Sequence, residues 1–261
     1  MSADARLAAS LAGRAGDLLL AIRDGGAGSG PGSEPGLSDP AELGRRGDRE
    51  SNDLILAALA EQRPGDAVLS EESADDPGRA TAARVWIVDP LDGTREFTMP
   101  GRRDWAVHVA LWERGEGITA AAVAEPALGM VYSSDGVTPA AAPTPVPRRR
   151  PVILVSDTRP PAFAGALARR LDAVVAPMGS AGAKAMAVLR GEADAYVHAG
   201  GQWEWDSAAP VGVALAGGLH ASRLDGKPLE YNQSRPYVPD LVVCRRDLAA
   251  AIVEAVAALT L

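Results

Sequence analysis

Apolar residues divide the chain into a first half of long helices with short strands and a second half in which strands and helices alternate. Five apolar residues near the N-terminus recur at helical spacing and predict an amphipathic helix; they are Leu7, Leu11, Leu18, Leu19 and Ile22. The Gly-, Ser- and Pro-rich segment 25–36 that follows predicts a loop. A second helix is expected to open near Asp48 and to end before the breaker pair Pro64-Gly65.

Short apolar runs predict the remaining elements. In the first half they predict hairpin-like strands at 67–70, 85–88, 104–112, 120–124 and 130–133. In the second half, strands predicted at 152–156, 173–176, 193–198, 219–222 and 241–244 alternate with helices that begin after Pro160-Pro161, after the turn 178–180, near Asp206 and at Leu248. This alternation indicates an α/β layer in which at least some strands pair in parallel.

The segment 138–151 is rich in alanine and proline and carries no periodic apolar pattern, so it predicts a domain boundary. A chain of 261 residues can form one large domain or two small ones. We expect an N-terminal α+β subdomain over residues 1–140 and a C-terminal α/β subdomain over residues 151–261.

Composition excludes several classes of partner. The net charge of −8 gives no electrostatic footprint for a nucleic acid. No apolar run reaches the length that spans a membrane, and the N-terminus lacks the pattern of a signal peptide. The single cysteine, Cys244, rules out an internal disulfide and fits the reducing cytoplasm. The sequence therefore predicts a cytoplasmic protein that binds neither nucleic acid nor membrane.

The stretch from Arg84 to Phe97 concentrates the candidate chemistry. The apolar run 85–88 leads to Asp89 at the end of a buried strand, and Pro90 is expected to break that strand because it offers no N–H to a ladder. The turn continues with Asp92, Gly93 and Thr94. Two carboxylates so close together repel each other unless a cation neutralises them. The stretch predicts a metal site that handles phosphates, and an ordinary Asx-rich turn is the alternative.

Further acidic residues stand beside other predicted elements. Glu71 follows the strand at 67–70, and Asp206 lies where a helix is expected to begin. Magnesium prefers hard oxygen ligands, which carboxylates supply. Asp206 could instead be only the N-cap of its helix. The histidines lie in apolar runs without paired ligand spacing, so we interpret them as core or strand residues; they are His108, His198 and His220.

Backbone groups could hold phosphate oxygens at two turns. Gly93 lets a ligand approach the chain closely, and Thr94 stands at the start of the next segment, where free N–H groups attract anions. The segment 179–182 before Lys184 offers a second such turn, although glycine and serine also simply make turns.

The motif from Trp86 to Thr94 resembles the first signature of the inositol monophosphatase superfamily, whose members are magnesium-dependent, lithium-sensitive phosphatases. The segment 204–209 is similar to its second signature, and Glu71-Glu72 to its upstream acidic pair. The order and spacing agree from about Leu7 to the C-terminus. The resemblance implies a layered α-β-α-β-α sandwich of the sugar-phosphatase type and a homodimer.

Several details resemble the bacterial, in particular actinobacterial, 3'(2'),5'-bisphosphate nucleotidases of sulfur assimilation; they are Ser70-Glu-Glu72, the segment 92–97, the segment 178–184, the segment 200–206 and the segment 224–232. Inositol phosphatases more often carry Gly before the acidic pair and Thr-Asn after Asp-Gly-Thr, where this chain has Ser70 and Arg95-Glu96. The expected reaction is therefore hydrolysis of adenosine 3',5'-bisphosphate to AMP and phosphate. Hydrolysis of 3'-phosphoadenylyl sulfate, inositol 1-phosphate or fructose 1,6-bisphosphate is the alternative, and another is a catalytically silent regulator that binds metal or nucleotide.

The resemblance also implies a role for each matching residue. Two or three Mg²⁺ ions would be held by Glu71, Asp89, the Leu91 carbonyl, Asp92 and Asp206. Asp48 and Thr94 would orient a metal-activated water for in-line attack on phosphorus, although Asp48 could instead be a helix N-cap. The substrate, a phosphorylated nucleotide or sugar, would contact Gly93, Thr94, Ser180, Lys184 and Asp206.

A rival enzyme class uses a covalent aspartyl-phosphate and resembles Asp-x-Asp-Gly-Thr, in which the nucleophilic aspartate lies two positions before the second aspartate. Here the step from Asp89 to Asp92 is three residues and includes Pro90. The spacing therefore favours an activated water over a covalent aspartate.

Overall fold

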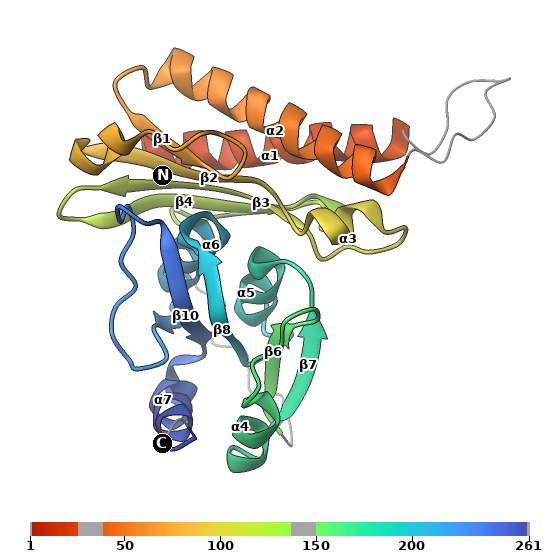
Figure 1. The fold of residues 1–261 in the computed structure, drawn as a ribbon, viewed down its shortest axis with the longest axis vertical. Helices are drawn as coiled ribbons and strands as arrows, with labels where there is room; N and C mark the ends of the chain where they lie inside the picture. The colour runs from red at the N-terminus through yellow and green to blue at the C-terminus, as the bar shows by residue number, and fades with distance from the viewer. Residues whose placement is uncertain (1, 26–38, 137–149, 260–261) are drawn as a thin grey trace, which may run out of the picture.

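The computed structural model describes residues 2–25, 39–136 and 150–259. The chain forms five layers, α-β-α-β-α, as Figure 1 shows from top to bottom. Helices α1 (Ala3–Gly25) and α2 (Pro40–Gln62) cover the outer face of the first sheet. Helices α5 (Ala181–Leu189) and α6 (Glu204–Ala216) lie between the sheets, and α4 (Ala164–Arg170) and α7 (Ala249–Ala257) cover the second. The expected layered sandwich is confirmed.

The first sheet has the order β1-β2-β3-β4-β5. Its strands are β1 (Ala67–Ser70), β2 (Arg84–Asp92), β3 (Ala106–Glu113), β4 (Gly117–Glu125) and β5 (Met130–Ser133). β1 pairs with β2 in parallel, and every other pair is antiparallel. The predicted strands are present, but the hairpin-like arrangement is wrong for β1, which is parallel to β2. Short helical segments flank them, namely η1 (Pro77–Thr81), α3 (Thr94–Thr98) and η2 (Pro126–Leu128).

The second sheet has the order β7-β6-β8-β10-β9. Its strands are β6 (Val152–Ser156), β7 (Val174–Met178), β8 (Ala195–Trp203), β9 (His220–Ser222) and β10 (Tyr237–Cys244), and η3 (Arg246–Leu248) precedes α7. β6 is parallel to β7 and β8, whereas β10 is antiparallel to β8 and β9. The prediction of partly parallel pairing is confirmed.

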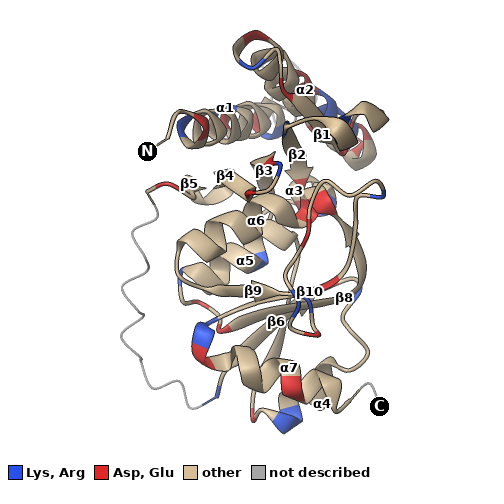
Figure 2. Cartoon of the chain, turned by 90° about the vertical axis from the view of Figure 1, so that its left-hand side faces the viewer, with Lys and Arg blue, Asp and Glu red and all other residues tan. Residues whose placement is uncertain are grey.

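Three buried clusters fill the spaces between the layers. One joins the apolar stripe of α1, for example Leu11 and Leu19, to β2 and β3. The middle cluster contains residues of both sheets, such as Ile87 and Val243, around α5 and α6. Charged residues in Figure 2 mark the outer helices, while the inner α5–α6 layer is almost entirely uncharged. The two halves of the chain therefore share the middle cluster.

Two sequence predictions about the first half of the chain are wrong in detail. The second helix begins at Pro40, eight positions before Asp48, because Asp39 caps it by accepting a hydrogen bond from the Ala41 N–H and Pro40 suits a first helical position. Pro90 does not end β2, which continues to Asp92. The proline instead produces an irregularity, since pairing with β3 passes from Asp89 to Asp92 with a shift of register.

Most of the expected subdomain boundary at 138–151 falls within 137–149, and most of the predicted loop at 25–36 falls within 26–38; the ranges 137–149 and 26–38 lie outside the described residues. Within the described parts of the chain, no helix combines the length and the apolar character needed to cross a membrane.

Candidate active site

The structure brings three carboxylates together at the end of β2 and the start of α6. One oxygen from each of Asp89, Asp92 and Asp206 lies within 4.8 Å of the others. The irregularity at Pro90 makes this possible on the β2 side, because it turns Asp89 and Asp92 toward the same place. The Asp89 Oδ1 accepts the Leu91 N–H at 3.0 Å, and the Pro90 carbonyl accepts the Ser51 hydroxyl at 2.8 Å, so the turn is fixed locally.

Asp206 reaches this cluster from the first turn of α6. Its Oδ2 accepts the Trp203 N–H at 2.6 Å, although Trp203 and not Asp206 occupies the N-cap position. Asp206 therefore adds a charge to the cluster from inside the first turn of α6, and the alternative that it is only the N-cap is wrong. The predicted helix start at Asp206 was two positions late.

The environments of the carboxylates fit a cation. Asp89 is fully buried, and its Oδ2 has no hydrogen-bond partner among the described residues. Burial first, and then the charges of Glu71, Asp92 and Asp206, raise the pKa of Asp89 well above its ordinary value. An unpaired oxygen on a buried carboxylate costs several kcal/mol unless something neutralises it. Hard oxygen donors are the ligands of Mg²⁺, so these residues could hold that ion.

Glu71 stands next to this triad at the end of β1. Its side chain reaches the surface, but the surrounding atoms exclude enough water that desolvation, followed by the charges of Asp206 and Asp92, raises its pKa to about 8. Burial and the charge of Asp92 also raise the pKa of Asp206, to about 6. The repulsion extends over all four carboxylates, as expected for a site built to receive positive charge.

Asp92 differs from the others because it has partners. Its Oδ2 accepts the Ser180 hydroxyl at 2.5 Å and the Gly182 N–H at 2.8 Å. Burial alone would raise the pKa of Asp92, but the His108 imidazole, the Ser180 hydroxyl and the Lys184 ammonium lower it below the ordinary value. Asp92 is therefore ionised more readily than its neighbours and is held in place by the start of α5.

Asp48 and Thr94 meet beside the cluster. The Thr94 hydroxyl lies 3.2 Å from Asp48 Oδ1 and 3.2 Å from the Leu91 carbonyl, and it can donate to either. Asp48 lies inside α2 and is not its N-cap, so that alternative is wrong. Burial first, and then the charge of Glu72, raise the pKa of Asp48 to about 7. The structure thus brings together the pair that the resemblance implied.

The predicted substrate-binding residues line a pocket of about 340 Å³ that opens onto Asp92 and Asp206. Gly93 and Thr94 form one wall, and Ser180 and Lys184 another. Ser180 has φ +40° and uses its hydroxyl for Asp92 and for the Ala183 N–H that it caps. A non-glycine residue in this region of backbone space is typical of a functional turn.

Lys184 is buried, and its ammonium donates to three carbonyls of the turn before α5, at Met178 (3.3 Å), Gly179 (2.8 Å) and Ser180 (2.7 Å). Burial lowers its pKa to about 8, against the opposing effect of Asp92. All three N–H donors are thus used within the protein. A direct contact with a phosphate, as the resemblance implied, would require Lys184 to give up one of these bonds.

His108 is a member of the site that the sequence interpretation assigned to the core. It lies opposite Asp89 in the β2–β3 pair. Its Nδ1 is 3.1 Å from the Trp205 carbonyl, and its Nε2 is 3.3 Å from Asp92 Oδ2, although poorly aligned for a hydrogen bond. One imidazole therefore connects β2 with the start of α6. The signal that could have found it was the pairing of strand 104–112 with the Asp89 strand.

Replacing Gly182 with alanine tests how tightly α5 fits against this imidazole. A Cβ at Gly182 would lie 2.1 Å from His108 Nε2 and 3.1 Å from the Ala106 Cβ, so His108 must move. We expect Gly182→Ala to destabilise the protein by about 1–3 kcal/mol in denaturant unfolding, because overpacking outweighs the better helix propensity of alanine.

The matched control is Gly165→Ala in α4, where the nearest side-chain atom to a new Cβ is 3.7 Å away. We expect that change to be neutral or to stabilise the protein by up to about 1 kcal/mol. Equal stability of the two variants would show that the packing of His108 against α5 is loose.

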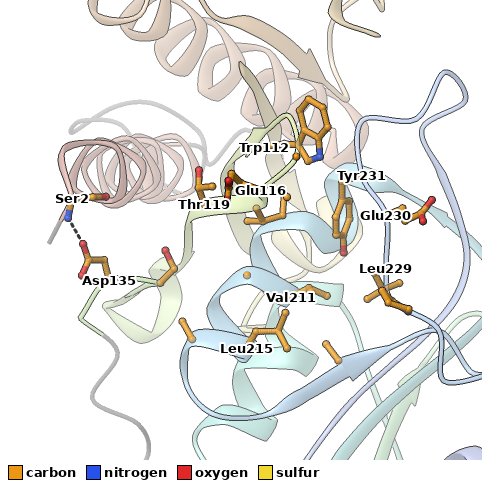
Figure 3. A pocket seen from close by; sticks show the side chains of 18 of the residues that line it. Ser2, Trp112, Glu116, Thr119, Asp135, Val211, Leu215, Leu229, Glu230 and Tyr231 are labelled. Atoms are coloured by element: carbon orange, nitrogen blue, oxygen red, sulfur yellow. Dashed lines mark hydrogen bonds between the residues drawn. The ribbon is translucent and has the colours of Figure 1, made fainter. Parts of the chain in front are cut away.

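A second and larger pocket, of about 930 Å³, lies away from the carboxylates, between the β3–β4 hairpin, α6 and the segment 228–233 (Figure 3). Trp112, Val211 and Tyr231 supply apolar walls, and Glu116 and Glu230 lie at its edge. Its described lining residues include no Lys or Arg. A phosphorylated anion would meet only negatively charged side chains there. The smaller pocket, next to Asp92 and Asp206, is therefore the candidate active site.

The chain is similar to known proteins in its sequence and in its fold. The sequence model of the inositol monophosphatase family matches residues 6–260. The chain is 56% identical over 255 residues to a 3'-phosphoadenosine 5'-phosphate phosphatase of Mycobacterium leprae (strain TN), covering 94% of this chain and 90% of that protein. It is 30% identical over 241 residues to the 3'(2'),5'-bisphosphate nucleotidase CysQ of Escherichia coli (strain K12), covering 87% of this chain and 94% of that protein.

The fold is also that of solved structures. Inositol monophosphatase II from Staphylococcus aureus MSSA476 superposes with a TM-score of 0.73 at 21% identity, covering 95% of this chain and 92% of that one. The family resemblance seen in the sequence motifs is thereby confirmed. The chain belongs to the inositol monophosphatase family.

Proposed function

We propose that the protein is a 3'(2'),5'-bisphosphate nucleotidase that converts adenosine 3',5'-bisphosphate to AMP and phosphate. The observation that carries this proposal is the 56% identity, over 94% of the chain, to a 3'-phosphoadenosine 5'-phosphate phosphatase. The carboxylate cluster and the adjoining pocket supply what a phosphomonoesterase of this family requires.

The family is metal-dependent, and we propose Mg²⁺, in two or three copies, as the resident ion. Asp89, Asp92 and Asp206 would hold it, together with Glu71 and the Leu91 carbonyl. When bound, the ion lowers the pKa of water and neutralises charge on the phosphate. The carboxylates keep the ion and the substrate in one place, which removes much of the entropic barrier to in-line attack.

Thr94 and Asp48 are proposed to handle the proton of the attacking water. Thr94 Oγ1 accepts a proton from the water while its own proton passes to Asp48 Oδ1, 3.2 Å away. The new bond from the water oxygen to phosphorus forms as the bond from phosphorus to the ribose oxygen breaks, and that oxygen takes a proton from solvent. A carboxylate with a pKa of about 7 suits this work near neutral pH.

Ser180 and Lys184 are proposed to shape the site in addition to lining it. The Lys184 ammonium donates hydrogen bonds to three carbonyls of the turn 178–180 and so holds this turn in place. The Ser180 hydroxyl and the Gly182 N–H then donate to Asp92. Gly93, with φ +87°, allows the chain to turn directly from Asp92 into α3, where the N–H groups of Gly93 and Thr94 would complement phosphate oxygens.

The test is a comparison of kcat/KM on adenosine 3',5'-bisphosphate, 3'-phosphoadenylyl sulfate, inositol 1-phosphate and fructose 1,6-bisphosphate, with magnesium and with lithium added. We expect the highest value on the adenosine bisphosphate and inhibition by lithium. A higher value on inositol 1-phosphate or fructose 1,6-bisphosphate would replace the proposed substrate. No magnesium-dependent phosphate release on any of the four would favour a silent binding protein.

Two further expectations rest on the sequence. A homodimer follows from the family resemblance alone, and light scattering of the purified protein would test it. A cytoplasmic location follows from the single cysteine, and fractionation of cells would test it.

A further inference from the structure

Arg159 is a cation in the pocket whose hydrogen-bond donors have no partner among the described residues. Among the described residues, the pocket is lined by three basic side chains, Arg95, Lys184 and Arg159. Arg95 pairs with Glu96 and Asp157, and Lys184 donates to carbonyls. The exposed guanidinium of Arg159 forms no hydrogen bond or ion pair in the described part of the chain, which leaves it available to a ligand.

Arg159 is nevertheless close enough to the site to act on it. Its positive charge is one of the influences that lower the pKa of Asp206, opposing burial and the charge of Asp92. It also contributes to the lowered pKa of His198, for which burial is the main cause. Arg159 therefore faces the same space as the carboxylates, from the loop that follows β6.

Gln202 adds an independent sign of a missing ligand. Its side chain is 6% exposed and lines the same pocket, and its Nε2 has no hydrogen-bond partner among the described residues. The Tyr196 hydroxyl, 3.4 Å from Gln202 Oε1, supports the orientation that leaves Nε2 free. A buried amide donor without a partner costs about 1–3 kcal/mol, which a ligand oxygen would recover.

An irregularity in β8 gives Gln202 this position. Pairing with β10 passes from Ala199 opposite Asp240 to Gln202 opposite Val238, so Gly200 and Gly201 bulge from the ladder. Both glycines have positive φ, and a Cβ at Gly201 would lie 1.6 Å from the Tyr237 hydroxyl. The bulge thus needs glycine, and it sets the direction of Gln202 at the end of the strand.

The electrostatics of the remaining wall favour an anion. Asp157 also lines the pocket, but Arg95 and Arg102 both pair with it and offset its charge. Arginine binds phosphate through a planar pair of N–H donors, and an amide N–H can bind a further oxygen. The carboxylate cluster with its cation takes one phosphate, and Arg159 with Gln202 stands in the same pocket for another anionic group.

We infer that Arg159 and Gln202 form a subsite for the second phosphate of a bisphosphorylated substrate, the one that is not hydrolysed. This inference rests on the proposed function and adds the residues that distinguish a bisphosphate from a monophosphate. Lys184, whose donors are occupied, supports the turn and is not the main ligand of that phosphate.

The test compares kcat/KM for adenosine 3',5'-bisphosphate with that for adenosine 3'-monophosphate, which lacks the second phosphate. The ratio of the two values should exceed one in the wild-type protein and fall about 10- to 100-fold in Arg159→Gln, as expected for loss of a hydrogen bond between charged groups. Arg159→Lys, which keeps the charge but not the planar pair of donors, should give an intermediate ratio. Gln202→Glu should also lower the ratio, because a negative charge replaces the donor.

The control is Arg170→Gln, an exposed arginine at the end of α4 in the outermost layer, which should leave the ratio unchanged. An unchanged ratio in Arg159→Gln would overturn the subsite while leaving the proposed function intact. If the wild-type protein hydrolyses inositol 1-phosphate better than the adenosine bisphosphate, the proposed function itself fails. The two failures are therefore distinguishable.

Discussion

Asp89→Asn should reduce magnesium-dependent phosphate release by a factor on the order of 10²–10³ or more, because it removes a charge from the centre of the cation site. Asparagine has nearly the same shape and can keep the contact between Oδ1 and the Leu91 N–H. It also removes one of the mutually repelling carboxylates. Without divalent ions, the variant should therefore be at least as stable as the wild-type protein.

Measuring thermal unfolding with and without Mg²⁺, in addition to activity, separates the loss of the cation site from a change in the stability of the fold. Magnesium should raise the Tm of the wild-type protein and raise that of Asp89→Asn much less. The matched control is Asp53→Asn, which changes an exposed aspartate on α2 and should alter neither activity nor Tm. Activity of Asp89→Asn within tenfold of wild type would contradict the assignment of Asp89 to the cation site.

Magnesium affinity should rise steeply with pH between about 6 and 8. The raised pKa values of Asp206 (about 6) and Glu71 (about 8) mean that, without the ion, these groups hold protons at pH values where an ordinary carboxylate is already ionised. The ion needs them deprotonated, so binding releases protons and weakens as pH falls through this range. Each released proton corresponds to a tenfold change in affinity per pH unit.

Isothermal titration calorimetry in buffers of different ionisation enthalpy measures the number of protons released when Mg²⁺ binds. We expect at least about one proton at pH 7 and fewer as the pH rises past about 8, where Glu71 becomes ionised without the ion. Glu71→Gln should lower that number at pH 7. No proton release at pH 6 or pH 7 would show that the carboxylates are already ionised without the ion.

Local spacing made the centre of the site predictable. Asp89, Asp92 and Thr94 lie within one turn of the chain, so their proximity follows from the sequence itself. The positions of Glu71 at a strand end and Asp206 at a helix start were predictable because these are places where side chains leave regular structure. The layered fold followed from the family motifs, since apolar periodicity indicated only the classes of element.

Other features depend on tertiary contacts that spacing does not encode. His108 looks like any strand residue until the β2–β3 register sets it opposite Asp89 and α6 brings the Trp205 carbonyl to its other nitrogen. The family resemblance implied that Lys184 contacts the substrate, but the turn 178–180 takes up its donors. The start of α2 was missed because the Asp39-Pro40 signal follows directly after a segment with loop composition.

The carboxylate cluster draws on both halves of the chain, and this has a mechanical consequence. Asp89 and Asp92 belong to the first sheet, whereas Asp206 lies in the first turn of a helix packed between the two sheets. An ion held by all three carboxylates would link β2 to α6 without a covalent bond. Its binding free energy would be lost if these two elements separated. The ion would therefore add to the cooperativity that the buried cluster shared by the two halves already provides.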